Sequence, residues 1–240
     1  MNTTLLYTRV LGKSDQSAPE PSYYKPYERR FLRTYKQFRP TIPHDLLICN
    51  CGVDSGADNV FDSVSTNQVY YNGPGWDIGA FQTVGQKIES DIVFCFASPA
   101  YFWRLNWIEP ILAAAQRFGP GLYGPMSSNE NSPHLRTIAI AFHPKIMRDF
   151  PMKVDTRQKT CLAESCQGGL TSWAIQAGFP VFLVTESGTF NPKNWREPCD
   201  VFRKGDQTNC LVWDRHADIY ISSDYPTRKY LERMANGEQS

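Results

Sequence analysis

The chain has 240 residues and a mass of 27.4 kDa, with 41% hydrophobic and 20% charged residues, far from the low hydrophobicity and high charge of disordered proteins. Its 25 basic and 24 acidic side chains nearly cancel, which excludes a protein that gathers nucleic acid or an anionic membrane by net charge alone. A single domain is expected, because α/β folds of this length often form one, and any recognition of phosphate has to be local.

The first half of the chain alternates short apolar runs with amphipathic segments. Apolar runs bounded by turn residues predict buried strands, and apolar residues at helical spacing predict helices that cover them. The expected strands cover 5–10, 45–50, 68–71 and 91–96, and the expected helices cover 23–38, 78–88 and 107–118.

The second half continues this alternation and then becomes irregular. Strands are expected at 136–142 and 180–185, helices at 144–150, 170–177 and 226–235, and an irregular segment rich in Trp, Asp and Arg at 186–220. The pattern predicts an α/β fold, a mostly parallel central sheet with helices on both faces. Such sheets bind ligands at the carboxyl ends of their strands. The site is therefore expected in the loops after Thr8, Cys49, Tyr71, Phe96 and Phe142, together with the irregular segment.

Two further features bear on the cellular setting. The apolar stretch near the amino terminus is too short and too broken for a signal peptide, and no run approaches the roughly 20 apolar residues of a membrane span. The seven cysteines include no C-x-x-C spacing and lie mostly in apolar surroundings, which is typical of buried thiols. We therefore expect a cytoplasmic protein.

One glycine-rich segment stands out as a candidate ligand loop. The fingerprints of dinucleotide-binding folds, P-loops, zincins and α/β hydrolases are absent from the sequence. Asn72-Gly-Pro-Gly-Trp-Asp-Ile-Gly79 instead precedes a predicted helix, and its backbone can approach a phosphate or a sugar closely. The alternative is a tight strand-to-helix turn in which Asp77 caps the helix.

This segment and its surroundings resemble GT-A type glycosyltransferases related to family 2. The resemblance spans most of the chain and rests on four segments in the family's order, namely 71–82, 90–96, 107–112 and 119–124. It implies a single glycosyltransferase domain over 1–240. In that domain 1–124 would bind the nucleotide-sugar, and 125–240 would bind the acceptor and carry catalysis.

The resemblance implies transfer of a sugar from a nucleoside-diphosphate sugar to a glycan or other hydroxyl acceptor, with inversion. Glu164 occupies the position of the family's catalytic carboxylate. An alcohol attacks an anomeric carbon poorly, and a general base beside it contributes roughly 10² to 10⁴-fold. The alternative for Glu164 is a carboxylate in the first turn of a helix, where the helix dipole favours it.

Two further sets of residues follow from the resemblance. The expected donor-binding residues are Thr8, Arg9, Asn50, Asp54, Asn72, Gly73, Asp77, Gly79, Ser98, Arg215 and His216. The expected acceptor-binding residues are Trp103, His134, Arg136 and Trp173. The alternatives are an ordinary surface ion pair for Asp214 and Arg215, a hydrogen-bonded loop residue for His216, and core packing for most tryptophans.

The family's D-x-D metal motif is missing from this chain. The end of the strand at 91–96 reads Ala97-Ser-Pro-Ala-Tyr101, and one hydroxyl replaces poorly the two carboxylates that a hard cation prefers. Basic side chains are therefore expected to balance the diphosphate, with Arg9, Arg104, Arg136 and Lys204 as candidates. Mn²⁺ or Mg²⁺ bound by acids elsewhere stays open, with Asp206, Asp214 and His216 as candidate ligands.

Two other functions stay open at this point. The missing D-x-D is compatible with a non-catalytic relative that binds a glycan or a nucleotide. A nucleotidyltransferase would instead release pyrophosphate from a nucleoside triphosphate and depend on a divalent cation. The base, the sugar and the acceptor are not determined by the sequence, because Asn50, Asp54 and Asp58 suit a base contact or a turn equally well.

Overall fold

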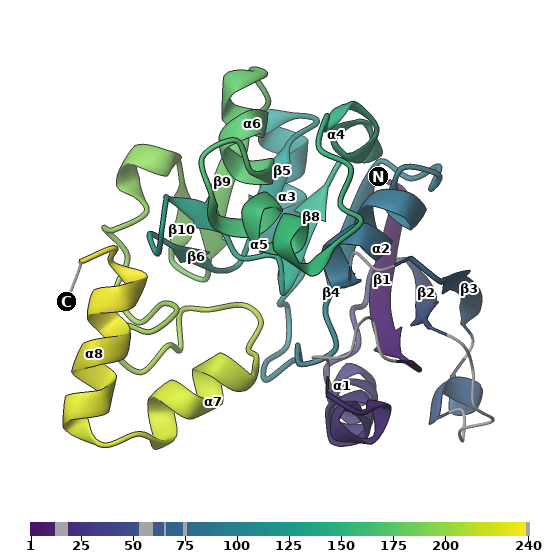
Figure 1. Cartoon of the computed structure of the whole chain (residues 1–240), viewed down its shortest axis with the longest axis horizontal. Helices are drawn as coiled ribbons and strands as arrows, with labels where there is room; N and C mark the ends of the chain where they lie inside the picture. The colour runs from purple at the N-terminus through teal and green to yellow at the C-terminus, as the bar shows by residue number, and fades with distance from the viewer. Residues whose placement is uncertain (13–18, 53–59, 65, 74–75, 239–240) are drawn as a thin grey trace.

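The computed structural model describes residues 1–12, 19–52, 60–64, 66–73 and 76–238. In this part of the chain an eight-stranded sheet has the order β10-β9-β5-β8-β4-β1-β2-β3 (Figure 1). Its strands are β1 (Thr3–Val10), β2 (Asp45–Cys51), β3 (Asn67–Tyr71), β4 (Ile92–Phe96), β5 (Leu122–Gly124), β8 (Ala139–Phe142), β9 (Val181–Thr185) and β10 (Gly188–Phe190). A separate two-stranded sheet pairs β6 (Ser127–Ser128) with β7 (His134–Leu135).

The sheet is mostly parallel, as the sequence predicts. Strand β1 pairs in parallel with β2 and β4, β2 with β3, and β5 with β9. Strand β8 is antiparallel to both β4 and β5, and β10 is antiparallel to β9. No crossover helix separates β5 from β8, so the chain returns in the opposite direction. The carboxyl ends of β1, β2, β3 and β4 therefore share one edge.

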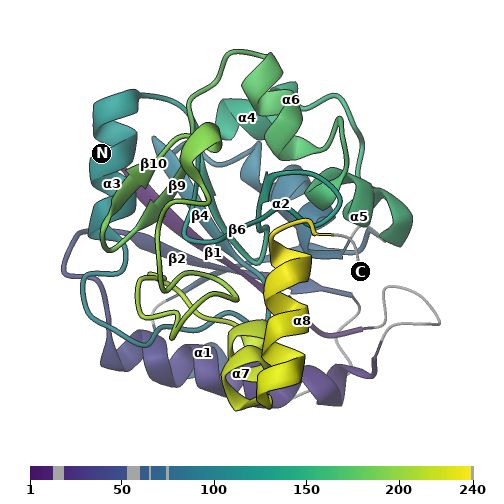
Figure 2. The ribbon, with the colours of Figure 1, turned by 90° about the vertical axis from the view of Figure 1, so that its left-hand side faces the viewer.

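Helices cover both faces, as expected. Figure 2 shows α3 (Glu109–Phe118) on one side of the sheet and α2 (Trp76–Gly85), α4 (Pro144–Asp149), α5 (Arg157–Ser165) and α6 (Leu170–Gln176) on the other. Helix α1 (Lys25–Gln37) packs through Phe31, whose ring stacks on Tyr7 of β1 with centroids 3.9 Å apart. Phe96 of β4 meets the same ring at 5.8 Å, so the aromatic core ties α1 to the sheet.

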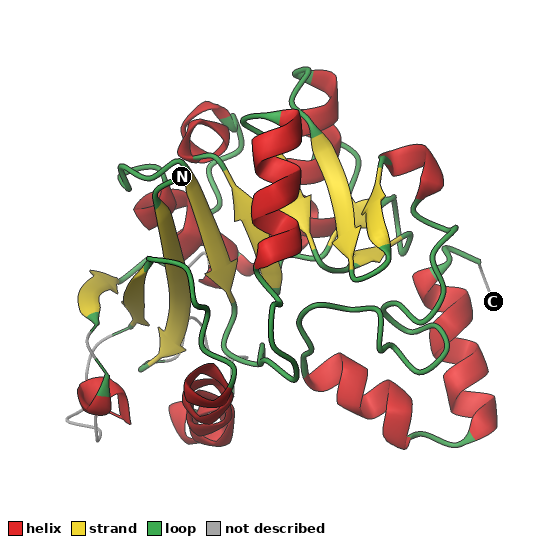
Figure 3. Ribbon diagram, turned by 180° about the vertical axis from the view of Figure 1, so that it is seen from behind, coloured by secondary structure: helices red, strands yellow, loops and turns green. Residues whose placement is uncertain are grey.

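The carboxy-terminal region differs most from the expectation. It contains η3 (Pro192–Asn194), α7 (Arg215–Ser222) and α8 (Tyr225–Ala235), and Figure 3 shows that loops connect most of the preceding segment. The prediction of an irregular segment up to residue 220 is therefore wrong at its end. Asp214 begins α7 as its N-cap, because its Oδ1 accepts the Ala217 N–H at 2.8 Å.

Other elements also differ from the predicted ones. The expected strand at 136–142 shortens to β8, which leaves Arg136 in the loop after β7. Helix α5 has no counterpart in the prediction, and the short 3₁₀ segments η1 (Pro21–Tyr24) and η2 (Val60–Ser63) were not expected. Over the described residues, no helix combines the length and the apolar character needed to cross a membrane.

Candidate functional site

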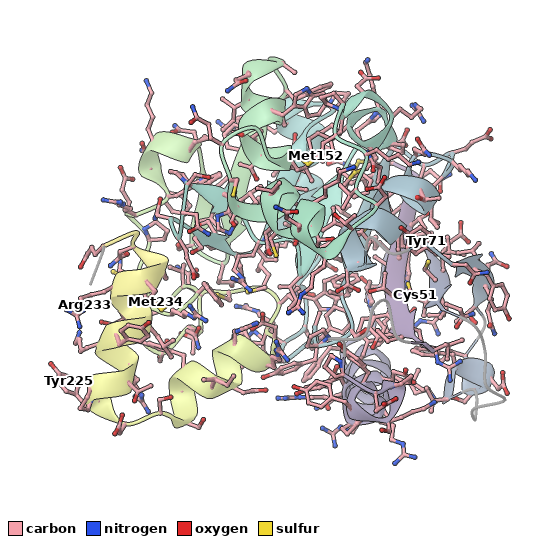
Figure 4. The ribbon with its side chains drawn as sticks, viewed as in Figure 1. Cys51, Tyr71, Met152, Tyr225, Arg233 and Met234 are labelled. Atoms are coloured by element: carbon pink, nitrogen blue, oxygen red, sulfur yellow. The ribbon has the colours of Figure 1, made fainter. Side chains whose placement is uncertain are left out.

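A cavity of about 350 Å³ lies at the shared carboxyl edge of the strands. Val10 is the last residue of β1, and Cys51, labelled in Figure 4, is the last residue of β2, and both line the cavity. One side of the cavity, called the strand-end wall, consists of Val10, Gly12, Cys51, Gly52, Asn72, Gly73, Asp77 and Ile78. The other side, called the arginine wall, consists of Arg136, Thr137, Ile138, Arg157, Thr160, Cys161, Glu164, Arg215 and His216. Tyr24, Ala97 and Pro99 complete the lining.

Asp77 is the one carboxylate of the strand-end wall, and a buried hydroxyl holds it in place. It lies in the first turn of α2, and Thr8 Oγ1 donates to its Oδ1 at 2.5 Å. Thr8 has no exposed surface, and Ser98 Oγ donates to the Thr8 carbonyl at 2.9 Å. Burial and the nearby charge of Glu164 raise the pKa of Asp77 to about 6, against the opposing hydrogen bond from Thr8.

The glycines before α2 serve a packing role. A Cβ at Gly73 or at Gly79 would collide with the hydroxyl of Tyr71, and at Gly79 also with the Val154 carbonyl. The side chain of Tyr71, labelled in Figure 4, therefore requires glycine at both positions. We expected a ligand to lie close to the backbone of these glycines. At Gly79 the close neighbours are Tyr71 and Val154 of the protein itself, whereas Gly73 borders the cavity as well as Tyr71.

Glu164 is the carboxylate of the arginine wall. It lies in the last turn of α5, so the interpretation as a first-turn carboxylate stabilised by the helix dipole is wrong. Its Oε1 accepts the Thr137 N–H at 3.2 Å. Burial raises the pKa of Glu164, but the charges of Arg136 and His134 and the hydrogen bonds from Thr137 lower it further, to below its usual value. Glu164 is therefore ionised at neutral pH.

The arginine wall contains buried donors without partners. The guanidinium groups of Arg136 and of Arg203, which lies behind the wall, sit 4.4 and 5.1 Å from the ring centre of Phe202. Within the described part of the chain, the buried Nε atoms of Arg136, Arg203 and Arg215 have no hydrogen-bond partner. Unpaired buried donors are rare and usually mark the place of water or an ion. This wall is therefore suited to the oxygens of an anion.

His216 and Asp214 adapt to this cationic environment. Burial and the charges of Arg136, Arg215 and Arg203 lower the pKa of His216 to about 3, so the imidazole is neutral at physiological pH. The Oδ2 of Asp214 lies 4.0 Å from Arg136 Nη2, and burial raises the pKa of this carboxyl. A neutral imidazole can donate a hydrogen bond to an anion without adding another positive charge.

A polar cluster between α1 and α7 positions the wall residues of α7. Arg30 pairs with both oxygens of Asp218, at 2.5 and 3.2 Å, and its guanidinium lies 3.3 Å from the ring centre of Tyr101. Tyr101 donates to Asp218 Oδ1 at 2.6 Å. Because Asp218 follows Arg215 by less than one turn of α7, this Arg30–Asp218–Tyr101 clamp fixes the helix turn that carries Arg215 and His216.

The cavity brings together seven of the residues expected from the sequence, namely Asn72, Gly73, Asp77, Arg136, Glu164, Arg215 and His216. Other expected donor residues lie behind the strand-end wall, where Arg9 pairs with the buried Glu28 at 3.3 Å and Asn50 donates to Gln68. Thr8 and Ser98 support Asp77 from the same buried position. Asp54 and Asp58 lie outside the described residues.

The remaining expected residues have structural partners away from the cavity. Trp103 stacks on Trp213 with centroids 5.1 Å apart, and Trp173 packs against Phe150 at 5.3 Å. His134 is buried, with Nδ1 2.8 Å from the Ser132 carbonyl. Two of the basic candidates also have partners, since Arg104 pairs with Glu186 at 2.8 Å and Lys204 donates to the Arg196 and Pro198 carbonyls.

The residues at the proposed metal positions do not fit a divalent cation. Ser98 is 1% exposed and donates to a backbone carbonyl. Asp206 accepts from Thr208 in an exposed turn, and Asp214 and His216 lie among three arginines whose charge repels a cation. Where the chain is described, no three His, Cys, Asp or Glu side chains group as metal ligands.

Sequence reasoning missed the contribution of α5 to the cavity. Arg157, Thr160, Cys161 and Glu164 follow one another at helical spacing, so they lie on one face. Thr156 begins the helix as its N-cap, because its Oγ1 accepts the Lys159 N–H at 3.1 Å. This N-cap and the i, i+3, i+7 spacing are the signal that would have revealed the helix.

No protein-family model and no curated protein sequence matches the chain. Solved structures similar to it include nucleotide-sugar transferases, in keeping with the resemblance in the sequence. A candidate nucleotide-diphospho-sugar transferase from Desulfovibrio desulfuricans G20 is 15% identical, with a TM-score of 0.46, over 75% of this chain and 79% of the other.

TarS 1-349 of S. aureus in complex with UDP is 11% identical, with a TM-score of 0.44, over 67% of this chain and 53% of the other. The galactosyltransferase LgtC, in complex with donor and acceptor sugar analogs, is 9% identical, with a TM-score of 0.43, over 59% and 58%. This chain thus spans little more than half the length of these two. All three likenesses are distant, so the chemistry of the cavity has to be established from its own residues.

Proposed function

We propose that this protein binds a nucleoside-diphosphate sugar and transfers the sugar to a hydroxyl acceptor. The observation that carries the proposal is one cavity in which Arg136 and Arg215, each with an unpartnered buried Nε among the described residues, face two carboxylates in opposite electrostatic settings. Pairs of carboxyl groups whose environments push their pKa values apart commonly divide binding and acid–base roles between them.

The arginine wall would hold the diphosphate. Arg136 and Arg215 offer charged N–H donors, and Arg203 lies behind them with a free Nε. Such donors bind phosphate oxygens strongly and oppose the negative charge that develops on the leaving diphosphate. In this proposal Arg136 moves from the acceptor side to the donor side, and no step requires a metal ion.

Glu164 would accept the proton of the acceptor hydroxyl. Its lowered pKa keeps it ionised at neutral pH, so the basic form is always available beside the arginine wall. The expected stereochemical outcome is inversion at the anomeric carbon, because Glu164 would act as a base on the acceptor and would form no bond to the sugar. The cavity draws on residues from both 1–124 and 125–240. In this proposal the nucleoside would lie on the first half and the phosphates on the second.

The test compares wild type with Glu164→Gln in a panel of UDP-, GDP-, CMP- and dTDP-sugars, scored by nucleotide release in the presence and absence of a mixture of glycan acceptors. The substitution should lower kcat roughly 10² to 10⁴-fold and leave the dissociation constant of the donor within about threefold. Glu197→Gln, on an exposed segment, serves as the matched control and should behave as wild type.

Other outcomes point to the other candidate functions. Unchanged turnover in Glu164→Gln would remove this residue from the mechanism. Donor binding without release of nucleotide from any sugar would instead show a binding module. Release of pyrophosphate from a nucleoside triphosphate and a sugar phosphate would identify a nucleotidyltransferase.

A further inference from the structure

The two ends of the cavity differ in charge in the same way as the two ends of a nucleotide. Among the residues that the structure describes, the strand-end wall has apolar side chains at Val10, Cys51 and Ile78 and no basic residue, whereas the arginine wall has Arg136, Arg157 and Arg215. A nucleotide has an uncharged flat base at one end and phosphates at the other. Charge complementarity therefore places the base on the strand-end wall, next to Asp77.

Asp77 offers this end one oriented acceptor. Its Oδ1 accepts the hydroxyl proton of Thr8 at 2.5 Å. This fully buried hydroxyl has a second acceptor, the Phe96 carbonyl, at the longer distance of 3.2 Å. Among the residues that the structure describes, no hydrogen bond reaches the second carboxylate oxygen, and the side chain borders the cavity. That oxygen is left to the occupant of the cavity.

We propose that Asp77 selects the donor by its base, favouring bases with a ring N–H on the pairing edge (uracil, thymine and guanine) over cytosine and adenine. This inference rests on the proposed function and names the substrate class of the same site. An ionised carboxylate only accepts hydrogen bonds, so it is satisfied by the N3–H of uracil or thymine or the N1–H of guanine. Cytosine and adenine present a lone pair at the same position, beside their amino group, and the two acceptors repel each other.

The isosteric substitution Asp77→Asn gives a sharp test, because Thr8 decides how the amide is oriented. The hydroxyl proton of Thr8 has two acceptors within reach, and the amide oxygen would replace Oδ1, the nearer of the two. A Thr8 hydroxyl that keeps this shorter bond turns the NH₂ group toward the cavity. The site then offers a donor where the wild type offers an acceptor. The order of base preference should therefore reverse, and not simply weaken.

The experiment measures dissociation constants of UDP, GDP, CDP and ADP by isothermal titration calorimetry at pH 8. Wild type should bind UDP and GDP about 10- to 100-fold more tightly than CDP and ADP, and Asp77→Asn should bind CDP or ADP more tightly than UDP. The ratio of UDP to GDP then shows whether the wall accepts a pyrimidine or a purine. Glu164→Gln, the other carboxylate of the cavity, should keep the wild-type order.

A second variant keeps the test decisive if Asp77→Asn unfolds. Thr8→Val removes the hydroxyl that orients Asp77, so the preference for UDP over CDP should fall about tenfold while UDP still binds. Equal binding of all four diphosphates to wild type overturns the inference and leaves nucleotide binding intact. Equal weakening of all four in Asp77→Asn would place Asp77 on the ribose and also overturns it. If none of the four binds to wild type, the proposed function fails as well.

Discussion

The two walls of the cavity are built in different ways. The strand-end wall comes from the ends of β1 and β2 and the turn before α2, where Asp77 is held by a buried hydroxyl. The arginine wall comes from a loop, one face of α5 and the first turn of α7, and among the described residues the buried Nε atoms of Arg136 and Arg215 have no hydrogen-bond partner. The carboxylate of the first wall is held in place before a ligand binds, whereas the second wall has buried N–H donors that a ligand or solvent would satisfy.

This difference separates two tasks within one site. A preformed wall can discriminate between ligands, because its groups are fixed before binding. In the proposed function the arginine wall would supply affinity, because an anion would satisfy its unpartnered Nε donors and offset its positive charge. The variants below test whether affinity and discrimination separate in this way.

The largest effect is expected in the arginine wall. Arg215→Met removes a charged donor and should weaken binding of a nucleoside diphosphate about 10- to 100-fold, while the affinity for the nucleoside without phosphates stays within about twofold. Calorimetric titration with UDP and with uridine gives both values. Arg148→Met, on the exposed side of α4, is the matched control. An equal loss for the two ligands would contradict the division between the walls.

The ionised carboxylate of Asp77, in the strand-end wall, is expected to lower the free energy of unfolding at high pH. The pKa of Asp77 is raised to about 6, so the folded protein binds this proton more tightly than the unfolded chain does. The contribution of protonated Asp77 to the free energy of unfolding is complete below pH 4, near the pKa of an aspartate in the unfolded chain. It is lost as the pH rises through 6, the pKa in the folded protein. Asp77→Asn should therefore raise the free energy of unfolding by about 1 to 3 kcal/mol at pH 8 and by almost nothing at pH 4.

Urea unfolding at the two pH values measures this difference. The charge of Glu164 does not reverse the expected pH dependence of stability. Its negative charge raises the pKa of Asp77, as burial does. If Asp77→Asn instead lowered the free energy of unfolding at pH 8, the ionised carboxylate would have a stabilising partner. Asp77 would then not destabilise the folded protein.

The smallest effect is expected at the clamp that supports the arginine wall from outside. Asp218→Asn weakens the charge-assisted hydrogen bonds from Arg30 and Tyr101, at a cost of about 1 kcal/mol. The turn with Arg215 and His216 becomes less fixed, so KM for the donor should rise about fivefold with kcat within about twofold. Steady-state kinetics measures both, with Asp149→Asn on α4 as the control. A fall in kcat without a change in KM would assign the clamp to the chemical step.

The contrast between the walls also explains what the sequence could predict. The strands at 45–50 and 91–96 were predictable because their apolar runs are local and bounded by turn residues. The same holds for the turn at Asn72 and Gly73. The contact of Thr8 with Asp77 joins residues 69 positions apart and was not predicted, because it depends on how the first turn of α2 packs against the end of β1.

The arginine wall offered no such regularity. Arg136 was expected at the start of a strand, as an acceptor-binding residue or a partner of the diphosphate, and Arg215 was expected in the irregular segment as a donor-binding residue. Arg203 was not considered, because nothing in the sequence shows which charges the folded chain will bury. Glu164 was placed in the cavity although its position within a helix was wrong, since the resemblance identified the residue and not the helix. Only α5 carried a missed local signal, in the spacing of Arg157, Thr160 and Glu164.

The order of the strands in the sheet has a consequence for the synthesis of the protein. The neighbours β4, β1, β2 and β3 all come from residues before 97, and they carry Thr8 next to the turn of Asp77. Arg215 leaves the ribosome roughly 10 s later, at the usual 5–20 residues per second. The growing chain therefore completes the strand-end wall first, and the arginine wall is complete only when α7 emerges with Arg215 and His216.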